Sequence, residues 1–96
     1  MTGSGEPPPE EAPVPVPLED ELDLHSFFPA DVPSAVSEYL NAARGSFREV
    51  RLIHGRGIGV QREVVRALLA RREDVAGFFD APPERGGIGA TVVVFR

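Results

Sequence analysis

Residues 50–59 read VRLIHGRGIG, and this stretch decides the fold of the chain. Its first half places apolar side chains at Val50 and Leu52, as a strand does, and ends at His54. Its second half is a glycine loop, and apolar residues at helical spacing follow from Val60. A strand that runs through such a loop into a helix is typical of α/β proteins, which bind ligands at the edge of the sheet where these loops lie. The sequence therefore predicts a functional edge at His54.

The other histidine of the chain ends a second strand-like run. Leu22-Asp23-Leu24-His25 alternates in the same way, and the sequence contains only these two histidines. If the two runs are neighbouring parallel strands, both imidazoles emerge at the same edge of one sheet. We therefore expect His25 and His54 to lie close together.

The rest of the chain completes an α/β pattern. In order, we expect a strand within 18–24, a helix capped by Asp31 or Ser34 and stopped at Gly45, and a strand at 50–53. A helix from 60 to 71–72, a strand at 75–79, a turn at 81–89 and a strand at 91–95 follow. The predicted core faces of the two helices are Val32, Val36, Tyr39, Leu40 and Ala43, and Val60, Val64, Ala67 and Leu68, with Leu69 beside them. The order β-α-β-α-β-β predicts an α/β (α+β) two-layer sandwich with a four-stranded mixed sheet and two helices. The crossovers favour parallel pairing of the first three strands, with the last strand antiparallel.

The composition limits the class of protein. The 96 residues suffice for one small domain, and no apolar run approaches the ~18 residues that span a membrane. The N-terminus shows no basic and apolar leader segment, and the absence of cysteine excludes disulfides and thiolate metal sites. We therefore expect a cytoplasmic protein with no membrane partner.

Charge divides the chain into two parts. Residues 1–24 hold seven acidic residues and no basic one, whereas residues 25–96 hold all ten basic residues against eight acidic ones. Every basic residue is arginine, whose planar guanidinium suits phosphate. The net charge of −5 therefore comes from the N-terminal part, and the remainder is mildly basic and compatible with a nucleic-acid partner.

Six prolines fall within residues 1–17, among repeated acidic residues. Because this composition does not form a packed core, we expect a disordered acidic, proline-rich tail at 1–17 and a folded domain at 18–96. The tail could be a solvated linker, a docking segment for a proline-binding groove, or a negative shield against non-specific nucleic acid.

The glycine loop after His54 has a chemistry suited to phosphate. Glycines let the backbone approach a ligand, the following helix presents free N–H groups, and Arg56 can add a bidentate contact. A second glycine turn at 86–91 could close the same edge, or both loops could be plain turns. The spacing lacks the second half of a dinucleotide fingerprint and the lysine of a P-loop, so we expect no nucleotide cofactor. The predicted nucleic-acid or phosphate contacts are Gly55, Arg56, Gly57, Gly59, Arg62, Gly87 and Thr91.

The two histidines could act as a general acid and base, since imidazole accepts and donates protons near neutral pH. Asp23 shares a strand face with His25 and could orient it. Asp23, His25 and His54 could instead hold a divalent cation such as Mn or Mg, although the sequence requires no cofactor. The plain alternative is two surface histidines and an aspartate that accepts backbone N–H groups. Phe27 and Phe28, beside His25, could stack on bases or pack between helix and sheet.

Together these residues resemble the Smr (small MutS-related) domain. The motifs that carry the resemblance are Leu22-Asp23-Leu24-His25, His54-Gly55-Arg56-Gly57 and Gly86-Gly87-Ile88-Gly89-Ala90-Thr91, and their order and spacing match over residues 20–96. The resemblance implies a fold like the C-terminal domain of a bacterial translation initiation factor. It also implies a stand-alone member without an ATPase, and Asp23, His25 and His54 as the catalytic residues.

The activity that this resemblance implies is that of an endonuclease on DNA or RNA. One residue departs from the family pattern, because Ser26 stands where the family usually has glycine after the first histidine. A side chain at this position could alter the site. We therefore keep a second hypothesis, a non-catalytic module that binds nucleic acid, the ribosome or a protein partner. Cleavage by the parent protein distinguishes the two hypotheses.

Overall fold

The computed structural model describes residues 18–56 and 60–96. Its strands are β1 (Glu21–Asp23), β2 (Glu49–Ile53), β3 (Val75–Asp80) and β4 (Ala90–Phe95), and its helices are α1 (Val32–Ala43) and α2 (Val60–Ala70). Three short 3-10 helices are η2 (Pro29–Asp31), η3 (Pro83–Arg85) and η4 (Gly87–Gly89). The predicted tail at 1–17 and the loop residues Gly57 and Gly59 lie outside the described residues.

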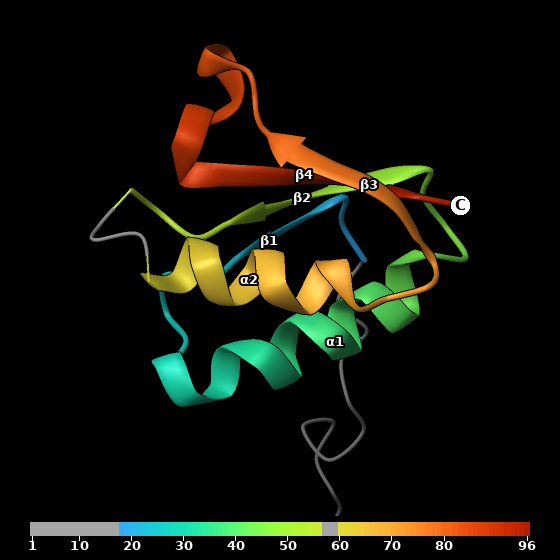
Figure 1. Cartoon of the computed structure of the whole chain (residues 1–96), viewed down its shortest axis with the longest axis horizontal. Coiled ribbons are helices and arrows are strands. Elements are labelled where there is room, and N and C mark those ends of the chain that lie inside the picture. The colour runs from blue at the N-terminus through green and yellow to red at the C-terminus, as the bar shows by residue number, and fades with distance from the viewer. Residues whose placement is uncertain (1–17, 57–59) are drawn as a thin grey trace, which may run out of the picture.

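The domain has two layers (Figure 1). Both helices lie on one face of the sheet, and the segment that carries η3 and η4 lies on the other side of it. This arrangement confirms the predicted two-layer α/β sandwich with a four-stranded mixed sheet. Among the described residues, no helix has the length and apolar character needed to cross a membrane.

The strand order in the sheet is β1-β2-β4-β3. β1 pairs in parallel with β2, with Leu22 opposite Leu52, and β4 pairs antiparallel with both β2 and β3. The predicted parallel pairing of the first three strands is therefore wrong for β3, because β4 lies between β2 and β3. Burial explains this order: the first four residues of β4 are all buried, as in a central strand covered on both faces.

The main core lies between the helices and the sheet. Its buried residues are Leu24, Val32, Val36, Leu40, Ala43, Val50, Leu52, Val65, Leu69, Val75 and Val93. The predicted face of α1 is confirmed, with Tyr39 only partly buried. The predicted face of α2 is rotated by about one residue, since Val65 and Leu69 are buried while Val60 and Val64 are exposed. One residue turns a helix by roughly 100°, so a small error in the predicted face exposes a different stripe.

Helix α1 begins and ends close to the predicted residues. Pro33 lies in its first turn, where a missing N–H costs no helical bond. Asp31 takes the N-cap position but its side chain makes no capping hydrogen bond, and Ser34 lies inside the helix, so the predicted capping role is wrong for both. The last turn closes with the N–H of Arg44 donating to the Leu40 carbonyl, and Gly45 follows.

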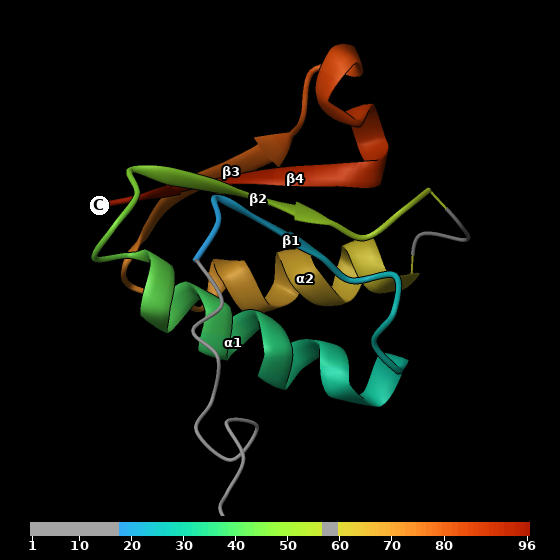
Figure 2. The same cartoon turned by 180° about the vertical axis from the view of Figure 1, so that it is seen from behind.

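Four segments meet at one end of the sheet (Figures 1 and 2). They are the end of β1, the end of β2, the start of β4 and the first turn of α2. Both histidine motifs and the second glycine turn therefore lie at the same end of the domain, where a site can be built from residues far apart in sequence.

Candidate functional site

An aspartate–histidine pair follows from the pairing at the end of β1. The N–H of Leu24 donates to the Ile53 carbonyl at 2.9 Å, which extends the pairing with β2. Nδ1 of His25 lies 2.7 Å from Oδ1 of Asp23, and the backbone N–H of His25 donates to the same oxygen at 2.9 Å. This backbone hydrogen bond is the main reason why the pKa of Asp23 lies below its ordinary value of 3.8. The carboxylate is therefore ionised near neutral pH, so in the neutral imidazole of His25 Nδ1 carries the proton donated to Asp23 and Nε2 carries the lone pair.

The ring of His25 reaches the glycine loop that follows β2. Gly55 has a φ of +81°, and a Cβ built on it would stand 3.0 Å from Nε2 of His25. Glycine is therefore needed here both for the backbone angle and for the space that the imidazole occupies. The side chains of His25 and Asp23 remain 64% and 60% exposed. The structure thus brings the first two motifs together and leaves the Asp23–His25 pair open to a substrate.

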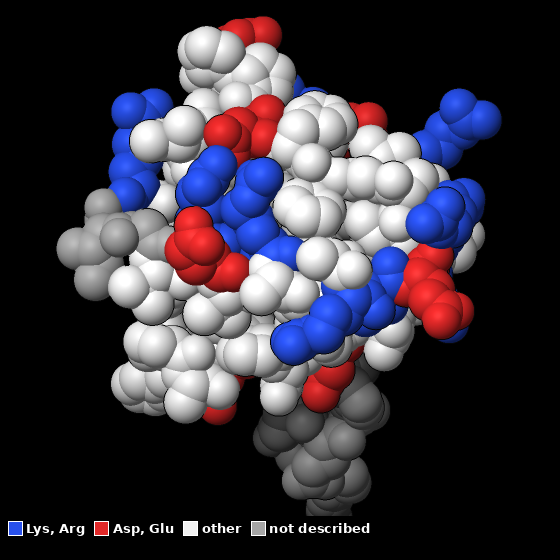
Figure 3. Space-filling model, in the orientation of Figure 1, with Lys and Arg blue, Asp and Glu red and all other residues white. Residues whose placement is uncertain are grey.

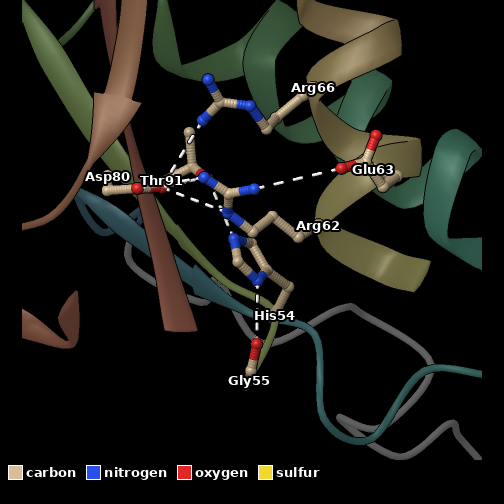
Figure 4. A network of polar contacts seen from close by, with 7 residues as sticks. All are labelled: His54, Gly55, Arg62, Glu63, Arg66, Asp80 and Thr91. Carbon is tan, nitrogen blue, oxygen red and sulfur yellow. Dashed lines mark hydrogen bonds and ion pairs between the residues drawn. The ribbon is translucent and has the colours of Figure 1, made fainter. Parts of the chain in front are cut away.

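His54 is buried, with only 6% of its surface exposed. Its Nδ1 lies 3.0 Å from the Gly55 carbonyl, and its Nε2 lies 2.8 Å from Oγ1 of Thr91 (Figure 4). A carbonyl only accepts, so Nδ1 carries the proton and Nε2 accepts from the Thr91 hydroxyl. Burial is the main cause that lowers the pKa of His54 below its ordinary value, so the ring is neutral at pH 7.

Strand alternation explains this burial. The side chains at 50, 52 and 54 share one face of the strand, and Leu52 is fully buried in the core that the helices cover. The prediction that both imidazoles emerge at the open edge is therefore wrong for His54. This residue lies inside the domain, attached through Gly55 to the loop that His25 touches.

Thr91, a predicted phosphate contact, is fully buried. It lies on β4 opposite Leu52 on one side and Asp80 on the other, and its hydroxyl is bonded to His54. The side chain of Thr91 does not reach the surface in this structure, so its burial counts against the predicted phosphate contact. The sequence contained a signal for the buried position of Thr91, because a hydroxyl in an apolar strand needs a buried hydrogen-bond partner.

Two arginines of α2 share one carboxylate on β3 (Figure 4). Nη2 of Arg62 lies 2.7 and 3.0 Å from the two carboxylate oxygens of Asp80, and Nε lies 3.2 Å from Oδ1. Arg66 reaches the same Oδ1 at 3.5 Å, and its guanidinium lies 5.0 Å from the centre of the Phe78 ring. Arg62, a predicted phosphate contact, is thus already paired with Asp80. Asp80 could not be predicted as this partner from local sequence, because it lies 18 residues from Arg62 and belongs to no motif.

The second glycine turn, at 86–91, is hydrogen-bonded to the loop that follows β2. The Gly89 carbonyl accepts the N–H groups of both His54, at 3.0 Å, and Gly55, at 2.8 Å. The Arg56 side chain lies across this turn, because a Cβ on Gly89 would meet its Cγ at 3.2 Å and a Cβ on Gly87 would meet its Nη2 at 3.1 Å. The turn therefore reaches the same edge, and its glycines leave room for an exposed Arg56. With residues 18–56 and 60–96 considered, Arg56 has no acidic partner.

The three residues that follow His25 differ in their exposure to solvent. Ser26 is exposed, Phe27 packs against the core, and Phe28 is 76% exposed. Of the two predicted uses of the phenylalanines, packing therefore applies to Phe27. Phe28 faces solvent, three residues after His25 in the sequence.

A shared metal centre was the alternative use of Asp23, His25 and His54. Within the described part of the chain, no group of three histidine, cysteine, aspartate or glutamate side chains is arranged to hold a metal ion. Asp23 and His25 lie together, but both ring nitrogens of His54 are bonded to Gly55 and Thr91. These three side chains therefore do not form one three-ligand centre in this geometry.

Comparison with known sequences finds relatives of this chain. The family model of the Smr domain matches residues 22–96. Endonuclease MutS2 of Thermus thermophilus is 40% identical over 77 residues, and Endonuclease MutS2 of Aquifex aeolicus is 36% identical over 84 residues. These matches cover 79% and 83% of this chain but 10% and 11% of the relatives. The chain thus spans about a tenth of the length of the curated relatives it matches.

Solved structures show the same fold. The crystal structure of the Smr domain of Thermus thermophilus MutS2 matches with a TM-score of 0.76 at 39% identity, and the match covers 81% of this chain and 99% of that one. YdaL, a stand-alone small MutS-related protein from Escherichia coli, matches with a TM-score of 0.75 at 27% identity, covering 80% of this chain and 64% of that one. With its three motifs gathered at one end of this fold, the chain belongs to the Smr domain family.

Proposed function

We propose that this chain is a nucleic-acid endonuclease, a phosphodiesterase in which His25 transfers the proton. The observation that carries the proposal is the exposed Asp23–His25 pair, whose carboxylate fixes the proton on Nδ1 and leaves the lone pair of Nε2 at the glycine loop. The names of the MutS2 relatives, which are endonucleases, support this reading. The match covers about a tenth of the length of those proteins, so endonuclease activity of this chain is our proposal.

The scissile phosphate would sit at the loop after β2. Arg56 is exposed there and offers a planar pair of donors to phosphate oxygens, and α2 begins at Val60 with the positive end of its dipole. Over the face shown in Figure 3, arginine and acidic side chains alternate and form no uniform basic surface. Binding would therefore depend on these local contacts, because Arg62 is already paired with Asp80.

The chemistry follows from the state of the His25 ring. Nε2 accepts the proton of the attacking oxygen, which is the 2′-OH of RNA or a water molecule on DNA. The new phosphorus–oxygen bond forms while the bond to the leaving oxygen breaks, and the leaving oxygen takes a proton from solvent. The ionised Asp23 stabilises the imidazolium formed, as the buried aspartate does in serine-protease triads.

His54 takes a positioning role in this proposal. Both of its ring nitrogens are bonded within the domain, and its Nδ1 holds the carbonyl of Gly55, the residue over which His25 lies. Its loss would therefore disturb the loop that receives the phosphate, and its effect on cleavage would come together with a loss of stability.

The direct test is cleavage of labelled single-stranded RNA and of supercoiled plasmid by the parent protein and by His25→Ala. Each reaction is run with EDTA, Mn²⁺ or Mg²⁺. We expect the parent to cleave at least one substrate, and His25→Ala to be at least about 100-fold slower with an unchanged circular dichroism spectrum. RNA cut in EDTA to a 2′,3′-cyclic phosphate supports proton transfer without metal, whereas cleavage only with metal assigns Asp23 and His25 to a cation. No cleavage under any condition contradicts the proposal.

The second candidate is a non-catalytic module that binds nucleic acid, the ribosome or a protein partner. The observation that favours it is the internal bonding of His54, which leaves only His25 with an exposed imidazole at this edge. This candidate predicts binding that His25→Ala does not change, with no cleavage by the parent. Either function fits a cytoplasmic location, which we also propose.

A further inference from the structure

We infer that Phe28 is a stacking platform for an unpaired base, and therefore that the substrate of this site is a single-stranded or locally unpaired nucleic acid. The inference rests on the proposed function, because it names the substrate class of the same edge. It starts from the exposure of Phe28, which at 76% is the highest among the large apolar side chains of the described residues.

The backbone around Phe28 is fixed at both ends. The N–H of Phe27 donates to the Leu24 carbonyl at 3.2 Å, and the carbonyl of Phe28 accepts the N–H of Asp31 at 2.8 Å. Phe27 packs on the core, and Pro29 begins η2 directly after Phe28. The ring therefore projects from an ordered turn. Because the backbone that carries the ring is already ordered, binding costs little further backbone freedom, which favours affinity.

The position of Phe28 relates it to the proposed chemistry. It follows His25 by three residues, so their Cα atoms lie within ~11 Å of each other by chain length. A base next to the scissile phosphate is within reach of a ring at that distance. Arg56, exposed at the same edge, provides the contact to the backbone.

Single-strand-binding proteins combine aromatic rings that stack on bases with cationic side chains that contact phosphates. Phe28 and Arg56 are the exposed aromatic and cationic side chains that follow β1 and β2 at this end of the domain. In a duplex each base face is already covered by its neighbours in the stack, so an added phenyl ring finds a free face only on an unpaired base. The exposed ring therefore selects for unpaired nucleic acid.

Fluorescence gives a sharp test because the chain contains no tryptophan. We would make Phe28→Trp as the reporter and Phe79→Trp as the matched control, both in a His25→Ala background that prevents cleavage. Phe79 is 49% exposed and pairs with Val92 on the sheet face away from the helices. Each variant is titrated with an unlabelled single-stranded 12-mer and with the same sequence as a blunt duplex, at one salt concentration.

We expect the single strand to quench the indole fluorescence of the Phe28→Trp reporter at lower concentration than the duplex does, with no response from the Phe79→Trp control. Binding of a labelled single strand to Phe28→Ala should be about 5- to 150-fold weaker than to the parent, the range for loss of one base stack, while Phe28→Tyr stays near the parent. Equal affinity of Phe28→Ala and the parent for the single strand would overturn the inference, as would preference for the duplex or no binding of the single strand.

These outcomes are separate from those of the proposed function. A parent protein that cleaves RNA and plasmid while Phe28→Ala cleaves them equally well keeps the endonuclease and rejects the platform. A parent that binds the single strand through Phe28 but cleaves nothing keeps the platform and rejects the endonuclease.

Discussion

Nε2 of His25 lies 3.0 Å from the point at which a Cβ on Gly55 would stand, so the catalytic candidate and the phosphate loop are in direct contact. The contact joins the ends of two parallel strands, β1 and β2, and both residues belong to the motifs by which the chain resembles its family. Substitutions at and around this contact have distinct expected effects on cleavage and on stability.

Gly55→Ala should reduce cleavage by about 100-fold while the domain stays folded. Alanine is strained at a φ of +81°, and its Cβ would displace the His25 ring from the loop. The His25 ring would have to move by a few tenths of an ångström while the loop backbone is strained, and misplacement of reacting groups slows catalysis steeply. Gly45→Ala is the matched control, because a Cβ at Gly45 has no atom within 4 Å. Rates are measured with both variants confirmed as folded, and equal rates for the two would reject the contact as functional.

Asp23→Asn should lower the cleavage rate by about 10²- to 10⁴-fold without unfolding the protein. The side-chain amide of asparagine can donate as well as accept, so the His25 ring is no longer fixed with its proton on Nδ1. Because Asp23 is exposed, the free energy of unfolding should change little. Nitrogen-15 NMR of the ring reports the tautomer directly. A variant that keeps both the Nδ1–H tautomer and full activity would remove Asp23 from the mechanism.

The stability of the parent should fall as the pH drops below 6.5, the ordinary pKa of histidine. The pKa of His54 is lowered in the folded state, so between that lowered value and 6.5 the unfolded chain binds the proton more readily. The free energy of unfolding is therefore highest above pH 6.5 and declines as the pH falls from there to the pKa of the folded state. Urea denaturation of the parent and His54→Gln across this range measures the effect. The variant should lose most of the slope, and identical slopes would contradict a buried, neutral His54.

Thr91→Val should destabilise the domain by about 1–3 kcal/mol, because it leaves the buried Nε2 of His54 without its donor. Thr91→Ser, which keeps the hydroxyl, is the control and should recover most of the loss in urea denaturation. If valine and serine behave alike, the hydroxyl does not hold the imidazole.

The local patterns of the sequence predicted the elements well. Alternation at Leu22 and Leu24, and helical spacing from Val32 to Ala43, each depend on neighbours within one element, and the structure places both as predicted. The meeting of the two histidine motifs also followed from local signals, because two parallel strands end at the same edge.

The remaining errors concern contacts between distant residues. His54 and Thr91 are 37 residues apart, and their bond forms only because β4 inserts beside β2. Because side chains alternate along a strand, the inward position of Leu52 implies that His54 also faces inward. His54 was predicted at the surface because a glycine loop follows it directly. The pairing of Arg62 with Asp80 is likewise a contact between distant residues, so no local signal in the sequence indicates it.

Cleavage of labelled single-stranded RNA by the parent protein and by His25→Ala, in the presence of EDTA, tests the role of His25 most directly. We predict that the parent produces a 2′,3′-cyclic phosphate and that His25→Ala, equally folded, is at least about 100-fold slower. Equal cleavage by the two proteins would contradict the role assigned to His25, and a parent that binds the RNA without cutting any substrate would leave the binding module as the function of this chain.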